Sequence, residues 1–177
     1  MKPASFKCDI RSETPEDYTL IDTINDEAFG QPDEGLLIRA LRKRSDFIPD
    51  LSLVAWVKGN PIGHVLFTPI EIHSGEKSFG SLALAPMAVR PQYQKKGVGT
   101  ALVAAGIEKA RQLGFKSIIV LGHPKYYPRF GFRPASLWSI KAPFEVSDDA
   151  FMALELTKEG LEGIHGTVAY PEEFQEV

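Results

Sequence analysis

The spacing of hydrophobic positions changes several times along the first third of the chain. Residues 6–11 alternate between apolar and polar side chains, which predicts a strand. Apolar residues then recur at helical spacing, in a segment that begins near Pro15 and ends before Gly30. Residues 34–43 repeat the helical pattern. The chain is therefore predicted to begin with a strand followed by two helices.

The middle of the chain has the pattern of a β-hairpin followed by another strand. Residues 51–58 and 62–72 are apolar runs separated by a turn sequence, and residues 82–89 form a further apolar run. Pro86 lies inside the third run. Because proline cannot donate to a sheet ladder, it indicates an edge, a bulge or a place where neighbouring strands part.

A long helical pattern and a buried strand follow. Residues 97–113 carry helical periodicity that ends at Gly114, a typical C-terminal glycine. Residues 117–121 are almost all apolar and β-branched, which indicates burial on both faces and a parallel partner. Strand, helix and strand make one βαβ unit, so the predicted fold class is mixed α/β.

The last part of the chain carries weaker patterns. Residues 135–149 are predicted to form a loop, residues 151–156 a late strand, and residues 167–170 a possible short strand. No repeat, low-complexity tract or linker interrupts the 177 residues. We therefore expect a single domain over residues 1–177.

The segment that joins the strand at 82–89 to the long helix has the chemistry of an anion site. It contains Gly97 and Gly99 at the helix start, preceded by Lys95 and Lys96. Free amides and the helix dipole favour negative charge at such a terminus. The segment therefore predicts a phosphate or diphosphate ligand.

Two common nucleotide motifs are excluded at this turn. A dinucleotide fingerprint requires a third glycine where this chain has Leu102. A nucleoside-triphosphate loop requires Gly-Lys-Ser/Thr, and no lysine separates Gly99 from Thr100. The remaining pattern is Gln94-x-x-Gly97-x-Gly99.

This pattern resembles the acetyl-coenzyme A signature of the GNAT N-acetyltransferase superfamily, whose main-chain amides wrap the coenzyme A diphosphate. The segment Tyr127-x-x-x-Gly131-Phe132 resembles a second signature of that family, and the two signatures occur in the expected order along the chain. The resemblance implies a mostly antiparallel central sheet with one parallel βαβ unit and splayed central strands. It also implies transfer of an acetyl group from acetyl-CoA to a primary amine, directly within a ternary complex.

The resemblance also implies which residues contact the coenzyme. They come from the strand end, the glycine turn and the second signature: Met87, Ala88, Val89, Gln94, Lys95, Lys96, Gly97, Val98, Gly99, Thr100, Tyr127 and Phe130.

Acetyl transfer requires an oxyanion donor and an acid for the departing thiolate. Because Pro86 has no N–H, the main-chain donor is expected at Met87 or Ala88. The family uses a tyrosine to protonate the thiolate, which assigns that role to Tyr127. Packing against the pantetheine arm or the core is the alternative role for Tyr127.

The sequence identifies the general base less clearly than the acid. Many family members carry a glutamate on the strand before the turn, but residues 81–89 contain no acidic residue. The remaining candidates are Glu34, Glu27 and His64, each of which also has a structural interpretation. A water chain without a dedicated base is equally compatible with the sequence.

Several other residues with reactive side chains have structural roles as the simpler interpretation. Tyr126 is expected to face away from the site, Arg129 to lie on a solvated face, and His123 to be a turn residue. Cys8, the single cysteine, is expected in a buried or half-buried strand position.

Composition excludes several classes of function. The formal net charge of −3 gives no reason to expect nucleic acid, and the scattered histidines give no zinc pattern. A single cysteine fits a reducing compartment. No apolar run reaches the roughly 20 residues of a membrane span, and the start is too polar for a signal peptide. We expect a cytoplasmic protein with no metal.

The sequence leaves two other functions open and predicts the kind of acceptor. The missing glutamate favours a non-catalytic module that binds acyl-CoA as a sensor or partner domain, whereas Tyr127 at the position of the second signature argues against it. A third alternative is a phosphate-binding fold for another nucleotide. The acceptor is expected to be a small-molecule or peptide amine, shaped by residues 18–45 and 135–149. By family analogy, a homodimer is possible through an exposed strand at 151–156.

Overall fold

A computed structural model describes residues 6–175, which divide into two compact units. The first unit comprises residues 6–67, 85–109 and 173–175, and the second unit residues 68–84 and 110–172. Three long elements belong partly to each unit: β3 (Asn60–Ser74), β4 (Lys77–Val89) and α3 (Val98–Gln112). The prediction of one acetyltransferase domain over residues 1–177 stays a prediction.

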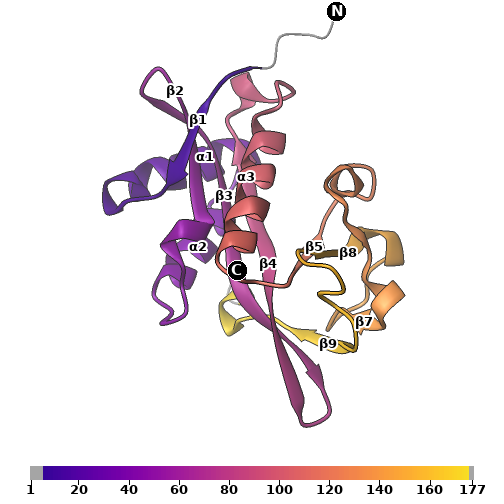
Figure 1. Cartoon of the computed structure of the whole chain (residues 1–177). Helices are drawn as coiled ribbons and strands as arrows, with labels where there is room; N and C mark the ends of the chain where they lie inside the picture. The colour runs from indigo at the N-terminus through magenta and orange to yellow at the C-terminus, as the bar shows by residue number, and fades with distance from the viewer. Residues whose placement is uncertain (1–5, 176–177) are drawn as a thin grey trace, which may run out of the picture. The chain divides into compact units, whose positions relative to one another are not determined.

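The sheet of the first unit has the strand order β1-β2-β3-β4. Strands β1 (Asp9–Ser12) and β2 (Ser52–Val57) pair antiparallel, and β2 pairs antiparallel with β3. Helices α1 (Tyr18–Phe29) and α2 (Asp33–Arg42) follow β1 in the chain (Figure 1).

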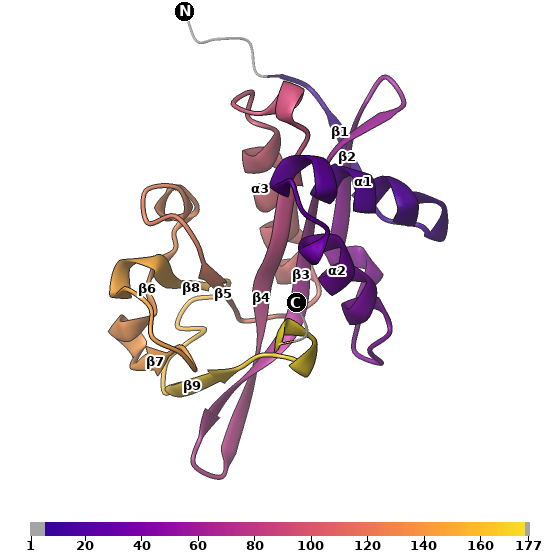
Figure 2. The same cartoon turned by 180° about the vertical axis from the view of Figure 1, so that it is seen from behind.

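The two faces of this sheet are covered by different helices. Leu66 of β3 packs in one apolar cluster with Ile21 of α1 and Leu41 of α2. Phe67, the next residue and therefore on the opposite face, lies against Gly106 of α3. Figures 1 and 2 show α3 on one side of the strands and α1 with α2 on the other.

The close packing of α3 on β3 depends on two glycines. A Cβ atom on Gly106 would lie 2.0 Å from the ring of Phe67. A Cβ atom on Gly63 of β3 would lie 2.9 Å from Leu102 and 3.2 Å from Val98. The glycines therefore let α3 pack close to β3.

The second unit contains the predicted parallel pair. Strand β5 (Ser117–Leu121) runs parallel to β4, paired at Leu82 and Ala83, and antiparallel to β8 (Phe151–Glu155). The remaining short strands are β6 (Arg133–Pro134) beside β8, β9 (Gly166–Ala169) beside β3, and β7 (Ile140–Lys141) beside β9. The predicted mixed α/β class is confirmed: the strand pairing is mostly antiparallel, with the predicted parallel pair β4–β5 and a second, short parallel pair, β7–β9.

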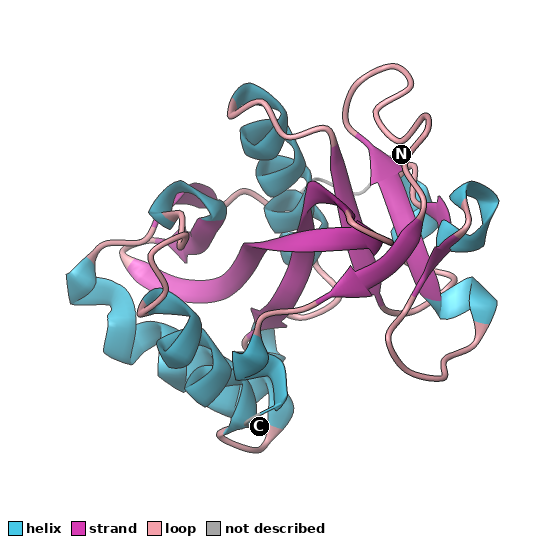
Figure 3. Ribbon diagram, turned by 90° about the horizontal axis from the view of Figure 1, so that it is seen from below, coloured by secondary structure: helices cyan, strands magenta, loops and turns pink. Residues whose placement is uncertain are grey.

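Short 3₁₀ turns, drawn in cyan like the α-helices in Figure 3, account for the other helical residues within residues 6–175. They are η1 (Pro15–Asp17), η2 (Pro49–Leu51), η3 (Pro91–Tyr93), η4 (Tyr127–Phe130), η5 (Ala135–Trp138), η6 (Asp148–Ala150) and η7 (Glu172–Gln175). No helix within residues 6–175 has the length and apolar character needed to cross a membrane.

Three expectations about elements are corrected. The first strand covers Asp9–Ser12 instead of residues 6–11, because its pairing with β2 ends at Trp56, so that half-buried Cys8 lies just outside it. The loop expected at 135–149 contains η5, β7 and part of η6. The late strand is not a free edge, because β8 pairs with β5 on one side and β6 on the other. A dimer through that strand is therefore not supported.

Candidate functional site

The glycine turn lies in the first unit between β4 and α3. After Val89 the chain makes the turn η3, and α3 begins at Val98. Lys95 has φ 61° and Gly97 has φ 87°, both in the left-handed region. Left-handed residues within such a turn orient successive amides toward one concavity, the geometry of a main-chain anion site.

Hydrogen bonds fix the entry to this turn. The Gln94 side chain donates to the Val89 carbonyl at 3.0 Å, so it closes the turn onto the end of β4. The Arg90 amide donates to the Ile62 carbonyl at 2.9 Å, and the Arg90 guanidinium donates to the Pro61 carbonyl at 2.8 Å. The predicted binding residue Gln94 therefore holds the loop through its side chain.

The amides at the start of α3 are available for an anion. The first turn closes with the Ala101 amide donating to the Gly97 carbonyl at 3.0 Å. The amides of Val98 and Gly99 come before this bond, where an α-helix has no intrahelical acceptor for them. Residues 94–97 are exposed. The helix dipole adds positive potential at the same place.

The two lysines of the turn have different surroundings. Lys95 is exposed, and within residues 6–175 its side chain has no ion pair or ring contact. The Lys96 ammonium lies 5.7 Å from the ring centroid of Phe6 and 5.8 Å from that of Tyr93. The sequence does not predict Phe6 as a neighbour of this turn, because only the tertiary structure brings the two segments together.

Tyr127 lies in the second unit, at the start of η4, and is 8% exposed. Its ring makes edge contacts with Tyr126 at 5.1 Å and Phe132 at 5.7 Å between centroids. It also covers Gly122, where a Cβ atom would lie 2.3 Å from the ring. Burial, with a smaller effect from Tyr126, raises the pKa of Tyr127 to about 12. The phenol is therefore protonated at neutral pH.

The three candidate bases differ in how accessible their side chains are to a substrate. Glu34 is half-buried in the first turn of α2 and accepts a hydrogen bond from the Gln31 side chain at 3.0 Å. Glu27 forms an ion pair with Arg90 at 3.0 Å. His64 is 0% exposed, so it cannot touch a substrate in this structure.

His64 belongs to a buried polar network that sequence reasoning missed. The Ser52 hydroxyl donates to Glu13 at 2.7 Å and lies 2.8 Å from His64 Nε2. Glu13 forms a bidentate ion pair with Arg42, at 3.0 and 2.8 Å. Because the Ser52 proton is used by Glu13, His64 Nε2 carries the hydrogen, and Nδ1 is a buried acceptor without a partner.

Burial, with a smaller contribution from Arg42, lowers the pKa of His64 to about 3. The imidazole is therefore neutral at physiological pH. The alternative interpretation of His64 as a satisfied strand histidine holds for Nε2, whereas Nδ1 has no hydrogen-bond partner among the described residues.

Other predicted residues occupy structural settings. The Arg129 guanidinium lies 4.2 Å from the Tyr126 ring and donates to the Tyr126 carbonyl at 2.9 Å. His123 is exposed, and Met87 and Ala88 lie on β4 with Ala88 buried. Within residues 6–175, no group of three or more His, Cys, Asp or Glu side chains could hold a metal ion.

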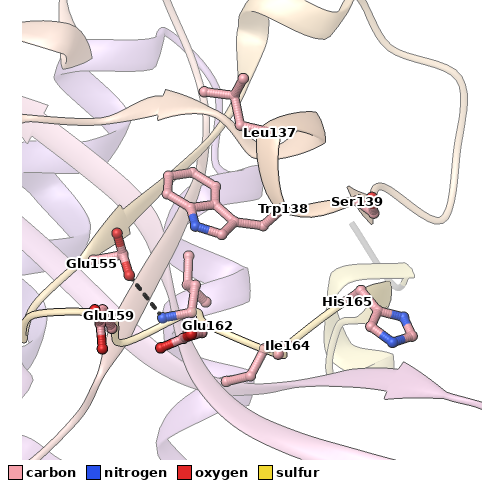
Figure 4. A pocket seen from close by; sticks show the side chains of 10 residues that line it. Leu137, Trp138, Ser139, Glu155, Glu159, Glu162, Ile164 and His165 are labelled. Carbon is pink, nitrogen blue, oxygen red and sulfur yellow. Dashed lines mark hydrogen bonds between the residues drawn. The ribbon is translucent and has the colours of Figure 1, made fainter.

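The second unit also contains two cavities away from the sequence motifs. One, of about 540 Å³, is lined by Trp138, Glu155, Glu159 and Glu162 among others (Figure 4). Glu155 accepts a hydrogen bond from the Leu161 amide at 3.0 Å, drawn as the dashed line in Figure 4. The other cavity, of about 810 Å³, is lined mainly by residues 140–148, within the segment expected to shape the acceptor side.

Comparison with known proteins supports the interpretation of the two motifs. The sequence profile described as the acetyltransferase (GNAT) family matches residues 12–132. The uncharacterised N-acetyltransferase YjhQ of Escherichia coli K12 is 38% identical over 134 residues, which cover 75% of this chain and 74% of that protein. The uncharacterised N-acetyltransferase YhbS of the same strain is 31% identical over 166 residues, covering 93% and 97% of the two chains.

Solved structures agree with the sequence relatives. The crystal structure of Escherichia coli YhbS in complex with CoA has a TM-score of 0.88 at 30% identity and covers 99% of this chain and 95% of that one. A GNAT family acetyltransferase from Brucella melitensis in complex with acetyl-CoA has a TM-score of 0.77 at 30% identity, covering 95% and 98%. This chain is therefore an acyltransferase that belongs to the acetyltransferase (GNAT) family.

Proposed function

We propose that the protein transfers an acetyl group from acetyl-CoA to a primary amine by direct attack within a ternary complex. The observation that carries the proposal is the turn between β4 and α3, where the amides of Val98 and Gly99 precede the first helical hydrogen bond. A diphosphate is the part of coenzyme A that suits such a site. The two structural relatives at 30% identity contain CoA or acetyl-CoA, which supports the same ligand here.

The transfer forms a nitrogen–carbon bond and breaks the carbon–sulfur bond of the thioester. The amine must be neutral to attack, so its proton passes to a base or to water. We assign the oxyanion donor to the main-chain N–H of Met87 or Ala88, because Pro86 has none. The thiolate takes a proton from Tyr127, which burial keeps in its protonated form.

Glu34 is the proposed base, with a water chain as the alternative. It is half-buried, and its only hydrogen-bond partner among the described residues is the exposed Gln31 side chain. Glu27 is a weaker candidate because its carboxylate pairs with Arg90. His64 is weaker still because it is enclosed.

The biological setting follows from the same proposal. We propose a cytoplasmic enzyme that acts on a small-molecule or peptide amine, without nucleic-acid or membrane partners and without a metal. A homodimer remains a proposal that does not use β8, since both sides of that strand are paired.

The test combines calorimetry with acetyl-CoA and a thiol-release assay over a panel of amines. Tyr127→Phe removes the acidic proton but keeps the ring, so we expect kcat to fall about 100-fold. The dissociation constant of acetyl-CoA should change less than about twofold. Tyr126→Phe is the matched control, because it removes a hydroxyl from the same aromatic cluster and should leave kcat within about twofold.

A second candidate function is a non-catalytic acyl-CoA-binding module. It is favoured by one observation, the absence of an acidic residue at positions 81–89 of β4. Tight binding of acetyl-CoA, no amine-dependent thiol release and no effect of Tyr127→Phe would support the module and contradict catalysis.

A further inference from the structure

The Lys96 ammonium is held in place by two aromatic rings. Its Nζ atom lies 5.7 Å from the centroid of Phe6 and 5.8 Å from that of Tyr93, and the two rings are 6.0 Å apart. Distances below about 6 Å are within the range of cation–π attraction. Lys96 has no carboxylate partner in the part of the chain that the structure describes. The charge is therefore positioned but not neutralised.

The two rings come from segments that precede the start of α3 in the chain. Phe6 precedes β1, and Tyr93 ends η3. In Figures 1 and 2 the described start of the chain runs beside the turn that leads into α3. The amides that we propose bind the diphosphate belong to Val98 and Gly99, which follow both lysines in the chain. Lys95 is exposed and has no such ring contact among residues 6–175, so its surroundings differ from those of Lys96.

Coenzyme A carries one more phosphate than the amide site accounts for. The diphosphate suits the helix N-terminus, whereas the ribose bears a separate 3′-phosphate monoester with up to two negative charges. A lysine ammonium fixed outside the amide site is suited to a second, separate phosphate.

We propose that Lys96, positioned by Phe6 and Tyr93, binds the ribose 3′-phosphate and makes the protein discriminate coenzyme A from dephospho-coenzyme A. This inference rests on the proposed coenzyme A site. It assigns different roles to two adjacent lysines: Lys96 contributes specificity for one phosphate, and Lys95 contributes general positive charge.

Calorimetric titration of the full chain with coenzyme A and with dephospho-coenzyme A tests this assignment. We expect the unmodified protein to bind dephospho-coenzyme A about tenfold more weakly, the effect of one charged contact. Lys96→Gln should weaken the binding of coenzyme A about tenfold and leave the dissociation constant of dephospho-coenzyme A within about twofold. Lys95→Gln, the matched control, should weaken both ligands by the same factor.

A second variant tests the aromatic support. Phe6→Leu keeps the lysine but removes one ring, so we expect the preference for coenzyme A to fall about threefold. Circular dichroism and melting temperature confirm that each variant is folded.

The outcomes separate this inference from the proposed function. Equal weakening of both ligands by Lys96→Gln, or no change with either, would overturn the role of Lys96 while leaving the coenzyme A site intact. If neither ligand binds the unmodified protein, the proposed function and this inference both fail.

Discussion

Burial shifts the pKa values of Tyr127 and His64 in opposite directions. In both cases burial disfavours the charged form, which is the deprotonated form of tyrosine and the protonated form of histidine. The pKa of Tyr127 therefore rises to about 12, and that of His64 falls to about 3. The same physical cause keeps a proton on the proposed acid and keeps the buried imidazole neutral.

The His64 shift makes stability depend on pH. In the unfolded chain histidine has a pKa near ~6.5, above its folded value of about 3, so the unfolded state binds the proton more readily. Above the unfolded pKa the group has no effect. As pH falls from about 6.5 to about 3, the free energy of unfolding decreases, by ~2 kcal/mol already at pH 5.

Replacement by glutamine isolates this contribution. His64→Gln keeps a donor for Ser52 but does not titrate in this range, so the unfolding free energy of the unmodified protein should fall relative to that of the variant by ~2 kcal/mol between pH 7 and pH 5. Urea denaturation at each pH measures the difference. A constant difference between the two proteins across this range would contradict the assignment.

At the level of elements, α3 connects the fold to the proposed site. Its N-terminus supplies the amides, and its contacts with β3 fix where that N-terminus lies. Those contacts are made at positions without side chains, Gly63 and Gly106, where Cβ atoms would lie 2.9 Å from Leu102 and 2.0 Å from Phe67. The glycines therefore serve packing, in a helix whose intrinsic propensity alone would favour alanine.

Gly106→Ala should destabilise the protein by about 1–3 kcal/mol, because a Cβ atom overlaps the fully buried Phe67 ring. The measurement is urea denaturation. Gly35→Ala in α2 is the matched control, since its Cβ atom would make ordinary 3.5 Å contacts with Asp22 and Asp26. The control should be neutral or slightly stabilising, and an equal loss in both variants would contradict the packing argument.

The glycine turn gives a second prediction at this scale. Gly97 has φ 87°, and a Cβ atom there would meet nothing within 4 Å. Gly97→Ala should therefore lose about 1 kcal/mol of stability from backbone strain alone. Because the added methyl group would lie in the turn that we propose holds the diphosphate, affinity for coenzyme A should fall more than about tenfold.

The hairpin residue Gly59 provides the control for strain. It has φ 77° and equally open surroundings, so Gly59→Ala should produce a similar loss of stability without a change in coenzyme A affinity. Thermal unfolding and calorimetry on both variants make the comparison. Unchanged affinity in Gly97→Ala would place the diphosphate elsewhere.

For the whole molecule, ligand binding and stability are linked. If acetyl-CoA binds the native state only, a concentration of 100 times the dissociation constant adds about 2.7 kcal/mol. For a chain of this length the melting temperature should rise by roughly 5–10 °C. Differential scanning fluorimetry with acetyl-CoA measures the rise, and ATP serves as the comparison. Stabilisation by ATP but not by acetyl-CoA would favour a nucleotide-binding function instead.

The sequence determined the fold class, the order of the main elements and the family, because these depend on local periodicity and on motifs a few residues long. The helical spacing of apolar residues, the buried strand before Gly122 and the Gln94-x-x-Gly97-x-Gly99 turn can each be recognised from a short stretch of sequence. Boundaries were less predictable, as at residues 6–8, where pairing with β2 decides where the strand begins.

Only the tertiary structure decided which residues from distant segments meet. Phe6 beside Lys96, Glu13 with Arg42 and Ser52, and Gly106 against Phe67 join segments separated in the chain, and no local pattern announces them. Such contacts depend on how helices pack on the sheet, and burial then sets properties such as the pKa of His64. Local chemistry specified the kind of protein, while packing specified the environment of its side chains.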